Sequence, residues 1–313
     1  MLIGKIKPKT TDREPEAKPK TRLVARSNKD FAHLDLPITP EEPITTLDKL
    51  VWLIYGENKI GKTSLCSRFP DPLFIFFEPG GKGLRLFKTP QLQYWDEFVK
   101  VIDNILRSDR FKTIIIDPID VCYKMAVTYI LDKYGVETFN EKGSVTAYGN
   151  GNRFVAELFE PQIRRLLASG RGVVFVAHAE KATIETRTGS EYNKITPRMP
   201  TKGKEHILDI VNIEAFYGYY GDDRYFTIQG SDELDAGHHL KYNFRTPSGE
   251  RVHSVPMFDP EDYSFDEDKA YDNLIAAFNN QQEGRYDPEE EGSFGPTLTP
   301  TKKVFKIKSK GGR

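Results

Sequence analysis

The sequence predicts an α/β fold with a mainly parallel central sheet flanked by helices, and three observations lead to this prediction. Short runs rich in Val, Ile and Phe alternate with segments of helical spacing over residues 51–216. These runs are apolar throughout, as in strands that are covered on both faces by helices. Two later runs follow without an intervening helix, which predicts antiparallel strands added at the edge of the sheet.

The individual elements follow from the same patterns. The predicted strands cover residues 51–55, 73–77, 113–116, 173–177 and 210–216, and the later antiparallel strands cover 224–228 and 239–245. The predicted helices cover 62–69, 95–107, 121–134 and 153–168, where apolar side chains recur three and four residues apart. A further helix is predicted near 266–279, where Ala270, Leu274, Ala277 and Phe278 recur at helical spacing. The ordered core is therefore expected over 45–257.

Charged residues are distributed unevenly along the 313-residue chain, although its formal net charge is only −1. Residues 1–30 hold nine basic and four acidic side chains, residues 258–291 hold two and twelve, and the last twelve residues hold six and none. Such blocks predict a basic flexible arm at 1–44, an acidic segment with one short helix at 258–291 and a basic flexible tail at 292–313. The net charge therefore does not exclude a nucleic-acid partner.

The composition favours an intracellular protein. Two cysteines, Cys66 and Cys122, are too few for a disulfide framework. The chain has no run of 18 apolar residues, so no membrane-spanning helix is expected, and its first twenty residues lack the apolar core of a signal peptide. We expect a cytoplasmic location and no membrane partner.

The strongest motif is GENKIGKT at residues 56–63, which matches G-x-x-x-x-G-K-[ST] in full. The apolar run VWLIY precedes it and the helical segment KTSLCSRF follows, which is the strand–loop–helix context of a phosphate-binding loop (P-loop). Its backbone N–H groups and the helix dipole favour a polyphosphate. We predict ATP as the ligand, bound by Gly56, Glu57, Asn58, Lys59, Ile60, Gly61, Lys62, Thr63 and Ser64.

Acidic and basic groups that serve the chemistry of ATP are expected nearby. Lys62 provides a charge for the terminal phosphates, and the Thr63 hydroxyl is a ligand for Mg²⁺. Asp117, which ends the apolar strand TIIID, is expected to hold the same Mg²⁺ ion. Asp120 is the competing candidate, but it follows Pro118, outside the strand.

Two further strand ends carry candidate catalytic residues. Glu78 ends the strand LFIFFE, where a carboxylate can polarise the attacking water, although it also begins the turn EPGGKG. His178 ends the strand VVFVAH, where a polar group can detect the γ-phosphate and reposition the loop behind it. Because a lone histidine at a strand end is more often structural, this role depends on the other strands.

Residues 46–250 resemble the phage-type RecA-like P-loop ATPases, the recombinase and single-strand-annealing group of AAA-domain phage nucleotide-binding proteins. The resemblance depends on the order of several segments. They are YGENKIGKTSL, FEPG, YWDEFVKVIDNIL followed by FKTIIIDPID, the Tyr148–Gly149 turn, SGRGVVFVAHAEK, ITPRMPTKGKEHILDIVNIEAFYG and the strand ending at residues 243–247.

The resemblance implies roles for individual residues. Glu78 would be the catalytic glutamate, and His178 would couple the nucleotide state to DNA-binding loops. Arg245 would reach the nucleotide of a neighbouring subunit, which implies a ring or filament. The chain departs from the family pattern at Pro118, where a hydroxyl residue is usual, and at Asn243, where a lysine is expected.

The segment after His178 is the predicted nucleic-acid contact. From Lys181 to Glu205 it holds six basic and three acidic residues together with Tyr192, a composition that can follow phosphates and stack a base. The basic residues are Lys181, Arg187, Lys194, Arg198, Lys202 and Lys204. A second loop, 135–152 with Tyr148, is a candidate for the same channel. A solvated hairpin or loop without a partner is the alternative.

We therefore expect a Mg²⁺-dependent ATPase, stimulated by single-stranded DNA, that acts in phage recombination or replication within a bacterial host. The charged tails would pair with each other or bind a single-strand-binding or replication protein. One alternative is a nucleotide-gated loader or scaffold that binds a protein rather than DNA. Another is a small-molecule kinase, for which the sequence has neither an Arg-rich lid nor an evident acceptor pocket.

Overall fold

The computed structural model describes residues 38–259 and 266–287. The chain divides into a unit of residues 1–42, of which only 38–42 are described, and a second unit that begins at Pro43. The remaining parts of the predicted arm, acidic segment and tail lie outside the described residues. All the described helices and strands belong to the second unit.

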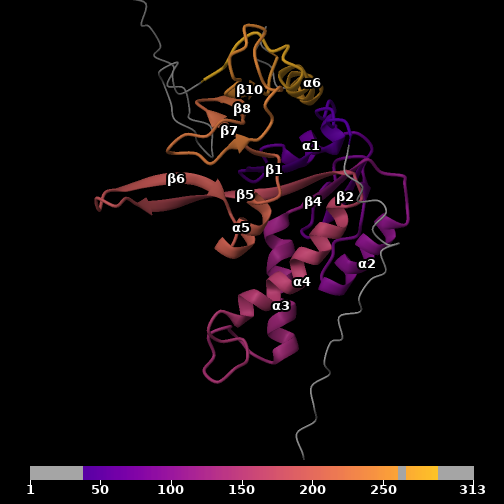
Figure 1. Ribbon diagram of the computed structural model, residues 1–313, viewed down its shortest axis with the longest axis vertical. Helices are drawn as coiled ribbons and strands as arrows, with labels where there is room; N and C mark the ends of the chain where they lie inside the picture. Colours follow the sequence, from indigo (N-terminus) through magenta and orange to yellow (C-terminus); the bar gives the residue numbers. More distant parts are fainter. Residues whose placement is uncertain (1–37, 260–265, 288–313) are drawn as a thin grey trace, which may run out of the picture. The chain divides into compact units, whose positions relative to one another are not determined.

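A ten-stranded sheet forms the centre of this unit (Figure 1). Its parallel strands are β1 (Val51–Gly56), β2 (Pro72–Phe76), β3 (Phe87–Lys88), β4 (Thr113–Asp117), β5 (Gly172–Glu185) and β7 (Ile213–Tyr220). They lie in the order β3-β2-β4-β5-β1-β7, so that β5 separates β1 from β4. This arrangement confirms the predicted α/β fold class with a mainly parallel central sheet.

Antiparallel strands complete the sheet. β8 (Asp223–Thr227) pairs with β7, β10 (Ser254–Pro256) pairs with β8, and the short β9 (Gly237–His238) pairs with β7. β6 (Glu191–Pro197) pairs with the second half of β5, which is longer than predicted, and the two form a ribbon that projects from the sheet (Figure 1). We call residues 179–197 the β5–β6 hairpin.

The predicted strand at 239–245 is wrong. Residues 239–245 are loop, because Phe244 has a left-handed backbone (φ 55°) that turns its ring into the core. There the ring packs edge-on against Trp52 and Phe278, at centroid distances of 6.5 and 5.6 Å. Core burial of this one aromatic side chain therefore replaces the regular pairing that the apolar and polar pattern predicts.

Helices cover both faces of the sheet. One face carries α2 (Trp95–Leu106), α3 (Ile119–Tyr134) and α4 (Asn150–Leu167), with α5 (Thr201–Leu208) beside α4. The other carries α1 (Lys62–Cys66) and α6 (Glu267–Phe278) (Figure 1). The short helix η2 (Leu47–Lys49) lies at the start of the unit. Each predicted helix is present, with ends that differ from the predicted ones by up to three residues.

Successive side chains of each strand point to opposite faces of the sheet, so one strand contributes to the apolar core on both faces. In β1, Leu53 and Tyr55 belong to the cluster beneath α2–α4, whereas Trp52 and Ile54 belong to the cluster beneath α1 and α6. All four are fully buried, and burial of one large apolar side chain contributes roughly 1.5–3 kcal/mol. A strand buried on both faces must be apolar throughout, which explains the continuous runs in the sequence.

Part of the predicted acidic segment folds onto this core. In α6, the four residues that the spacing singles out, Ala270, Leu274, Ala277 and Phe278, are all buried. The Asp266 side chain accepts hydrogen bonds from the backbone N–H groups of Asp268 and Lys269, which caps the helix. The acidic side chains therefore lie on the outer face of a helix whose other face is core.

Within the described residues, we find no helix that is both long and apolar enough to cross a membrane.

Candidate nucleotide site

The carboxyl ends of four parallel strands surround a cavity of about 480 Å³. In the register of the sheet, Gly56 of β1 lies beside His178 of β5, and Phe76 of β2 lies beside Asp117 of β4. Because parallel strands end at the same edge, polar residues that follow them meet there. The cavity is lined by Asn58, Lys59, Gly61, Lys62, Thr63 and Ser64 of the P-loop and by Phe76, Glu78, Pro79, Gly80, Asp117, Pro118 and His178.

The loop from Gly56 to Gly61 needs its glycines for specific reasons. A Cβ atom on Gly56 would lie 2.1 Å from the carbonyl oxygen of Tyr217, so no larger residue fits beside β7. Gly61 has φ 114°, which side chains rarely tolerate, and Lys59 is also left-handed at φ 68°. Of the predicted binding residues, Gly56, Glu57 and Ile60 do not line the cavity, and Ile60 is buried in the core.

Lys62 is held inside the loop by the loop's own backbone. Its ammonium donates hydrogen bonds of 2.8 Å to the carbonyl oxygens of Gly56 and Glu57, and the residue is buried. Burial lowers the pKa of Lys62 to about 8. The N–H groups of Lys62, Thr63 and Ser64 begin α1 and have no partner one turn earlier, so they remain available to an anion.

Thr63 and Asp117 converge on one point of the cavity. The Thr63 hydroxyl donates a hydrogen bond of 2.8 Å to Asp117 Oδ2. Burial raises the pKa of Asp117 above its ordinary value, so a cation at this point would offset the cost of its buried charge. A hydroxyl and a carboxylate are the oxygen ligands that Mg²⁺ prefers, and the pair therefore fits this ion.

Glu78 and His178 face each other across the cavity. Glu78 Oε2 lies 3.7 Å from His178 Nε2, which exceeds hydrogen-bonding distance. The Glu78 side chain is 45% exposed, whereas that of His178 is 13% exposed. The structure thus brings Lys62, Thr63, Glu78, Asp117 and His178 together, as the sequence predicts.

Behind His178 lies a pair of charged residues whose connection the sequence analysis missed. Asp120, at the start of α3, is fully buried and accepts hydrogen bonds from Arg198 Nε and Nη2, at 3.1 and 2.9 Å. Burial would raise the pKa of Asp120, but the groups beside it, Arg198 among them, outweigh burial and lower it. The sequence signal for this pair was an acidic residue, Asp120, in the first turn of the helix that directly follows the strand ending at Asp117.

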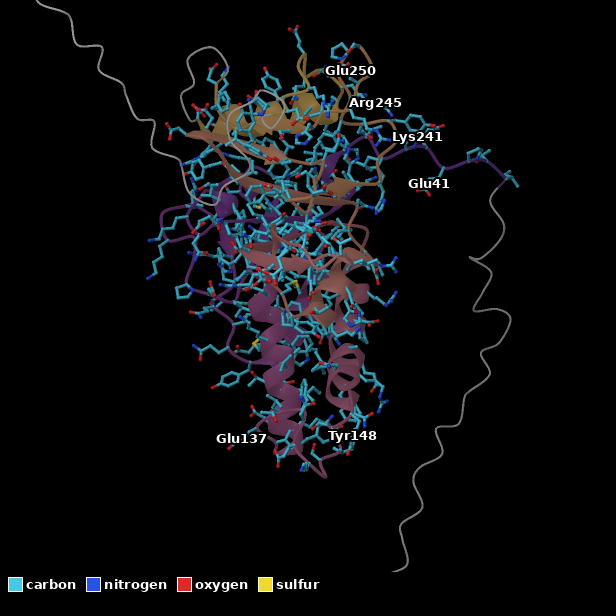
Figure 2. The ribbon with its side chains drawn as sticks, turned by 90° about the vertical axis from the view of Figure 1, so that its left-hand side faces the viewer. Glu41, Glu137, Tyr148, Lys241, Arg245 and Glu250 are labelled. Carbon is cyan, nitrogen blue, oxygen red and sulfur yellow. The ribbon has the colours of Figure 1, made fainter. Side chains whose placement is uncertain are left out.

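Arg245 lies away from this cavity. It lines a second cavity of about 450 Å³ together with His238, His239, Lys241 and Arg251. Its guanidinium donates to the carbonyl oxygens of Lys241 and Gly249, at 3.1 and 2.8 Å. Figure 2 shows Arg245 and Lys241 at the same end of the unit, opposite the end that carries Tyr148. Within one chain, therefore, Arg245 does not reach the P-loop.

Four of the six predicted nucleic-acid contacts are paired with carboxylates. Lys194 and Lys204 lie 2.9 Å from Asp235, Arg198 binds Asp120, and Lys202 lies 2.7 Å from Glu205 in the same helix. Lys181 and Arg187 are exposed on the β5–β6 hairpin, where Tyr192 is 36% exposed.

The loop with Tyr148 lies at the end of α3 and α4 away from the sheet, apart from the hairpin (Figures 1 and 2).

Comparisons with known proteins show what this chain is similar to. A family model described as an AAA domain matches residues 48–240. A prophage-derived uncharacterized protein of Bacillus subtilis strain 168, YorG of SPbeta, is 29% identical over 153 residues, which cover 47% of this chain and 45% of that protein. This chain therefore matches less than half of that relative's length. A KaiC-like protein of Pyrococcus horikoshii OT3 aligns with a TM-score of 0.36 and 12% identity, over 67% of this chain and 85% of that one.

Proposed function

This chain belongs to the AAA domain family, and from that premise we propose that it hydrolyses ATP with Mg²⁺ and uses the reaction to act on single-stranded DNA. The observation that carries the proposal is the convergence of the P-loop, Asp117, Glu78 and His178 on one cavity of about 480 Å³. Three of these parts come from separate strands, so their meeting is a property of the fold rather than of one motif.

The P-loop would hold the phosphates of ATP. The N–H groups at the start of α1 and the positive end of its dipole favour the polyphosphate. The Lys62 ammonium exchanges two neutral carbonyl acceptors for charged phosphate oxygens, and no carboxylate is left unpaired by the exchange. This gain favours binding, and the charge also stabilises the transition state of phosphoryl transfer.

Thr63 and Asp117 would hold the magnesium ion, Asp117 through a water molecule. Bound there, Mg²⁺ would neutralise charge that develops on the phosphate oxygens. Glu78 would orient and polarise the attacking water, because its carboxylate faces the cavity and is partly exposed to solvent. His178 Nε2 faces the same space and would contact either the γ-phosphate or Glu78.

Single-stranded DNA is the proposed partner because of the β5–β6 hairpin. The hairpin projects from the sheet and exposes Lys181 and Arg187 together with Tyr192, which suits phosphate contacts and base stacking (Figure 1). Arg245, in a cavity with Lys241 and Arg251, would meet the nucleotide of a neighbouring copy in a ring or filament. The prophage origin of the relative supports a phage role in the host cytoplasm.

A nucleotide-gated scaffold is the second candidate, and one observation favours it. Four of the six basic residues predicted to contact DNA are paired with carboxylates of this chain, which reduces the charge that the segment 181–205 offers to phosphates. Such a protein would bind ATP and a protein partner without contacting DNA.

ATP turnover with and without single-stranded DNA tests both candidates. We expect Mg²⁺-dependent phosphate release that increases several-fold with DNA. Turnover that is indifferent to DNA would favour the scaffold, and the absence of turnover in the presence of tight ATP binding would contradict the proposed hydrolysis.

A further inference from the structure

Four side chains form a continuous path from the nucleotide cavity to the β5–β6 hairpin. Glu78 Oε2 lies 3.7 Å from His178 Nε2, and the other ring nitrogen, Nδ1, faces Asp120 and Arg198. His178 belongs to the first half of β5, which is part of the sheet. Arg198 follows β6 directly, so the path joins the strand of the cavity to the return strand of the hairpin.

The main chain ties the same two residues together. The backbone N–H of Arg198 donates a hydrogen bond of 2.8 Å to the carbonyl oxygen of His178. Immediately before it, Pro197 of β6 pairs with Ala179 of β5. A displacement of β6 would therefore move Arg198 relative to His178.

The distances around His178 Nδ1 indicate which groups donate. Arg198 Nη2 lies 2.8 Å from Nδ1, whereas the two Asp120 oxygens lie 3.3 and 3.4 Å from it. An arginine side chain is always protonated and has no acceptor, so it can only donate to Nδ1. A hydrogen on Nδ1 would face the guanidinium hydrogen at this short distance. The geometry therefore favours Nδ1 as the acceptor, with the ring hydrogen on Nε2, toward Glu78.

The burial of Asp120 and His178 restricts these side chains and Arg198 to this arrangement. Asp120 is fully buried, His178 is 13% exposed and Arg198 is 39% exposed at the side chain. Asp120 receives two N–H groups of the guanidinium on one oxygen, which orients the planar group so that Nη2 also reaches the imidazole. A lysine has the charge but not this planar geometry.

We propose that Arg198 is a positioning residue that holds His178 in the tautomer with the hydrogen on Nε2, and that it thereby links the β5–β6 hairpin to the phosphate end of the cavity. Asp120 anchors the guanidinium in this role. The inference rests on the proposed function, since the Nε2 hydrogen would be donated to a γ-phosphate oxygen or to Glu78. It assigns to Arg198 an internal role in place of the predicted contact with nucleic acid.

Nitrogen NMR of the full chain labelled with ¹⁵N-histidine tests the tautomer without reference to activity. Spectra are recorded at pH 8, above the usual range of histidine pKa values, and His178→Gln identifies the signal. We expect the wild type to show the Nε2–H tautomer at His178 and Arg198→Gln to shift it toward Nδ1–H, held by Asp120. An Nδ1–H tautomer in the wild type, or no change in Arg198→Gln, would overturn the proposal.

Turnover separates this inference from the proposed function. In Arg198→Gln we expect kcat to fall at least fivefold while KM for ATP changes less than twofold. The matched control is Arg164→Gln, which removes a surface arginine paired with Glu160 on α4 and should leave both constants unchanged. If the wild type has no ATPase activity, the proposed function fails and the NMR result still decides the tautomer. If kcat in Arg198→Gln equals that of the wild type, the proposed link fails.

Discussion

The nucleotide cavity and the β5–β6 hairpin differ in the groups that hold their lysines, as Lys62 of the cavity and Lys194 of the hairpin show. Lys62 rests on two neutral backbone carbonyls, and burial lowers its pKa to about 8. Lys194 lies 2.9 Å from Asp235, whose hydrogen bond raises the pKa of the lysine. A ligand can take over the first cation at little cost, whereas taking over the second leaves a carboxylate unpaired.

The same contrast extends to the neighbours of each lysine. In the cavity, the Thr63 hydroxyl donates to Asp117 Oδ2, an arrangement that a metal ion can enter. Beside the hairpin, Asp235 receives Lys194, Lys204 and the Thr196 hydroxyl. The cavity is therefore arranged for an external anion and cation, whereas Lys194 and Lys204 are held by a carboxylate of the fold.

The largest effect is expected from removing the cavity lysine. Lys62→Ala removes the charge offered to the phosphates, and we expect ATP turnover to fall by at least about 100-fold. Phosphate release under saturating Mg²⁺ measures it. The control is Lys49→Ala, an exposed lysine of η2 outside the cavity, which should retain wild-type turnover. Equal turnover in the Lys62 and Lys49 variants would remove the distinction between the two regions.

A partly buried carboxylate, Glu214, lies near Lys194 and Lys204 and provides the next test. Burial, followed by the charge of Asp235, raises the pKa of Glu214 to about 7, and among the described residues its Oε1 atom has no hydrogen-bond partner. Because the folded-state pKa exceeds the unfolded one, the stabilising contribution is complete below about pH 4.5. It is lost as the pH rises through 7.

Glu214→Gln should remove this loss. We expect the variant to be more stable than the wild type by about 2–3 kcal/mol at pH 8 and similar to it near pH 5. Urea denaturation at both pH values measures the difference. The exposed control Glu157→Gln should show no such dependence. A Glu214→Gln effect of the same size at both pH values would mean that Glu214 does not titrate in this range.

The smallest effect concerns the hairpin and DNA. Replacing Lys181 and Arg187 by Ala should lower affinity for single-stranded DNA about tenfold at low salt and reduce the salt slope by about 1–2. Lys194→Ala removes a paired lysine from the same hairpin and should change the slope much less. Fluorescence anisotropy over a range of salt concentrations measures both. If the two changes are equal, the pairing with Asp235 does not decide which cations bind DNA.

Much of the fold could be predicted because its signals are local. Ala270, Leu274, Ala277 and Phe278 recur at helical spacing, and all are buried in α6. The strand ends at Glu78, Asp117 and His178 follow continuous apolar runs, and parallel pairing necessarily brings such ends to one edge. The cavity could therefore be assembled from the P-loop and the strand order.

What could not be predicted depends on partners far apart in the sequence. Arg198 and Asp120 are separated by 78 positions, and Lys204 and Asp235 by 31, so a count of basic residues cannot show that they are neutralised. Phe244 likewise is not in the predicted strand, because its ring packs against Trp52 and Phe278, which are distant from it in the sequence. Local composition predicts the charge that a segment carries but not the partner that holds it.

The role of Glu78 provides the most direct test of the proposed hydrolysis. Glu78→Gln keeps the size of the side chain and its place in the cavity but removes the carboxylate that would polarise the attacking water. Single-turnover hydrolysis should fall by about 100-fold or more while the Kd for ATP changes less than twofold. A variant that binds ATP and hydrolyses it at the wild-type rate would contradict the catalytic role of Glu78.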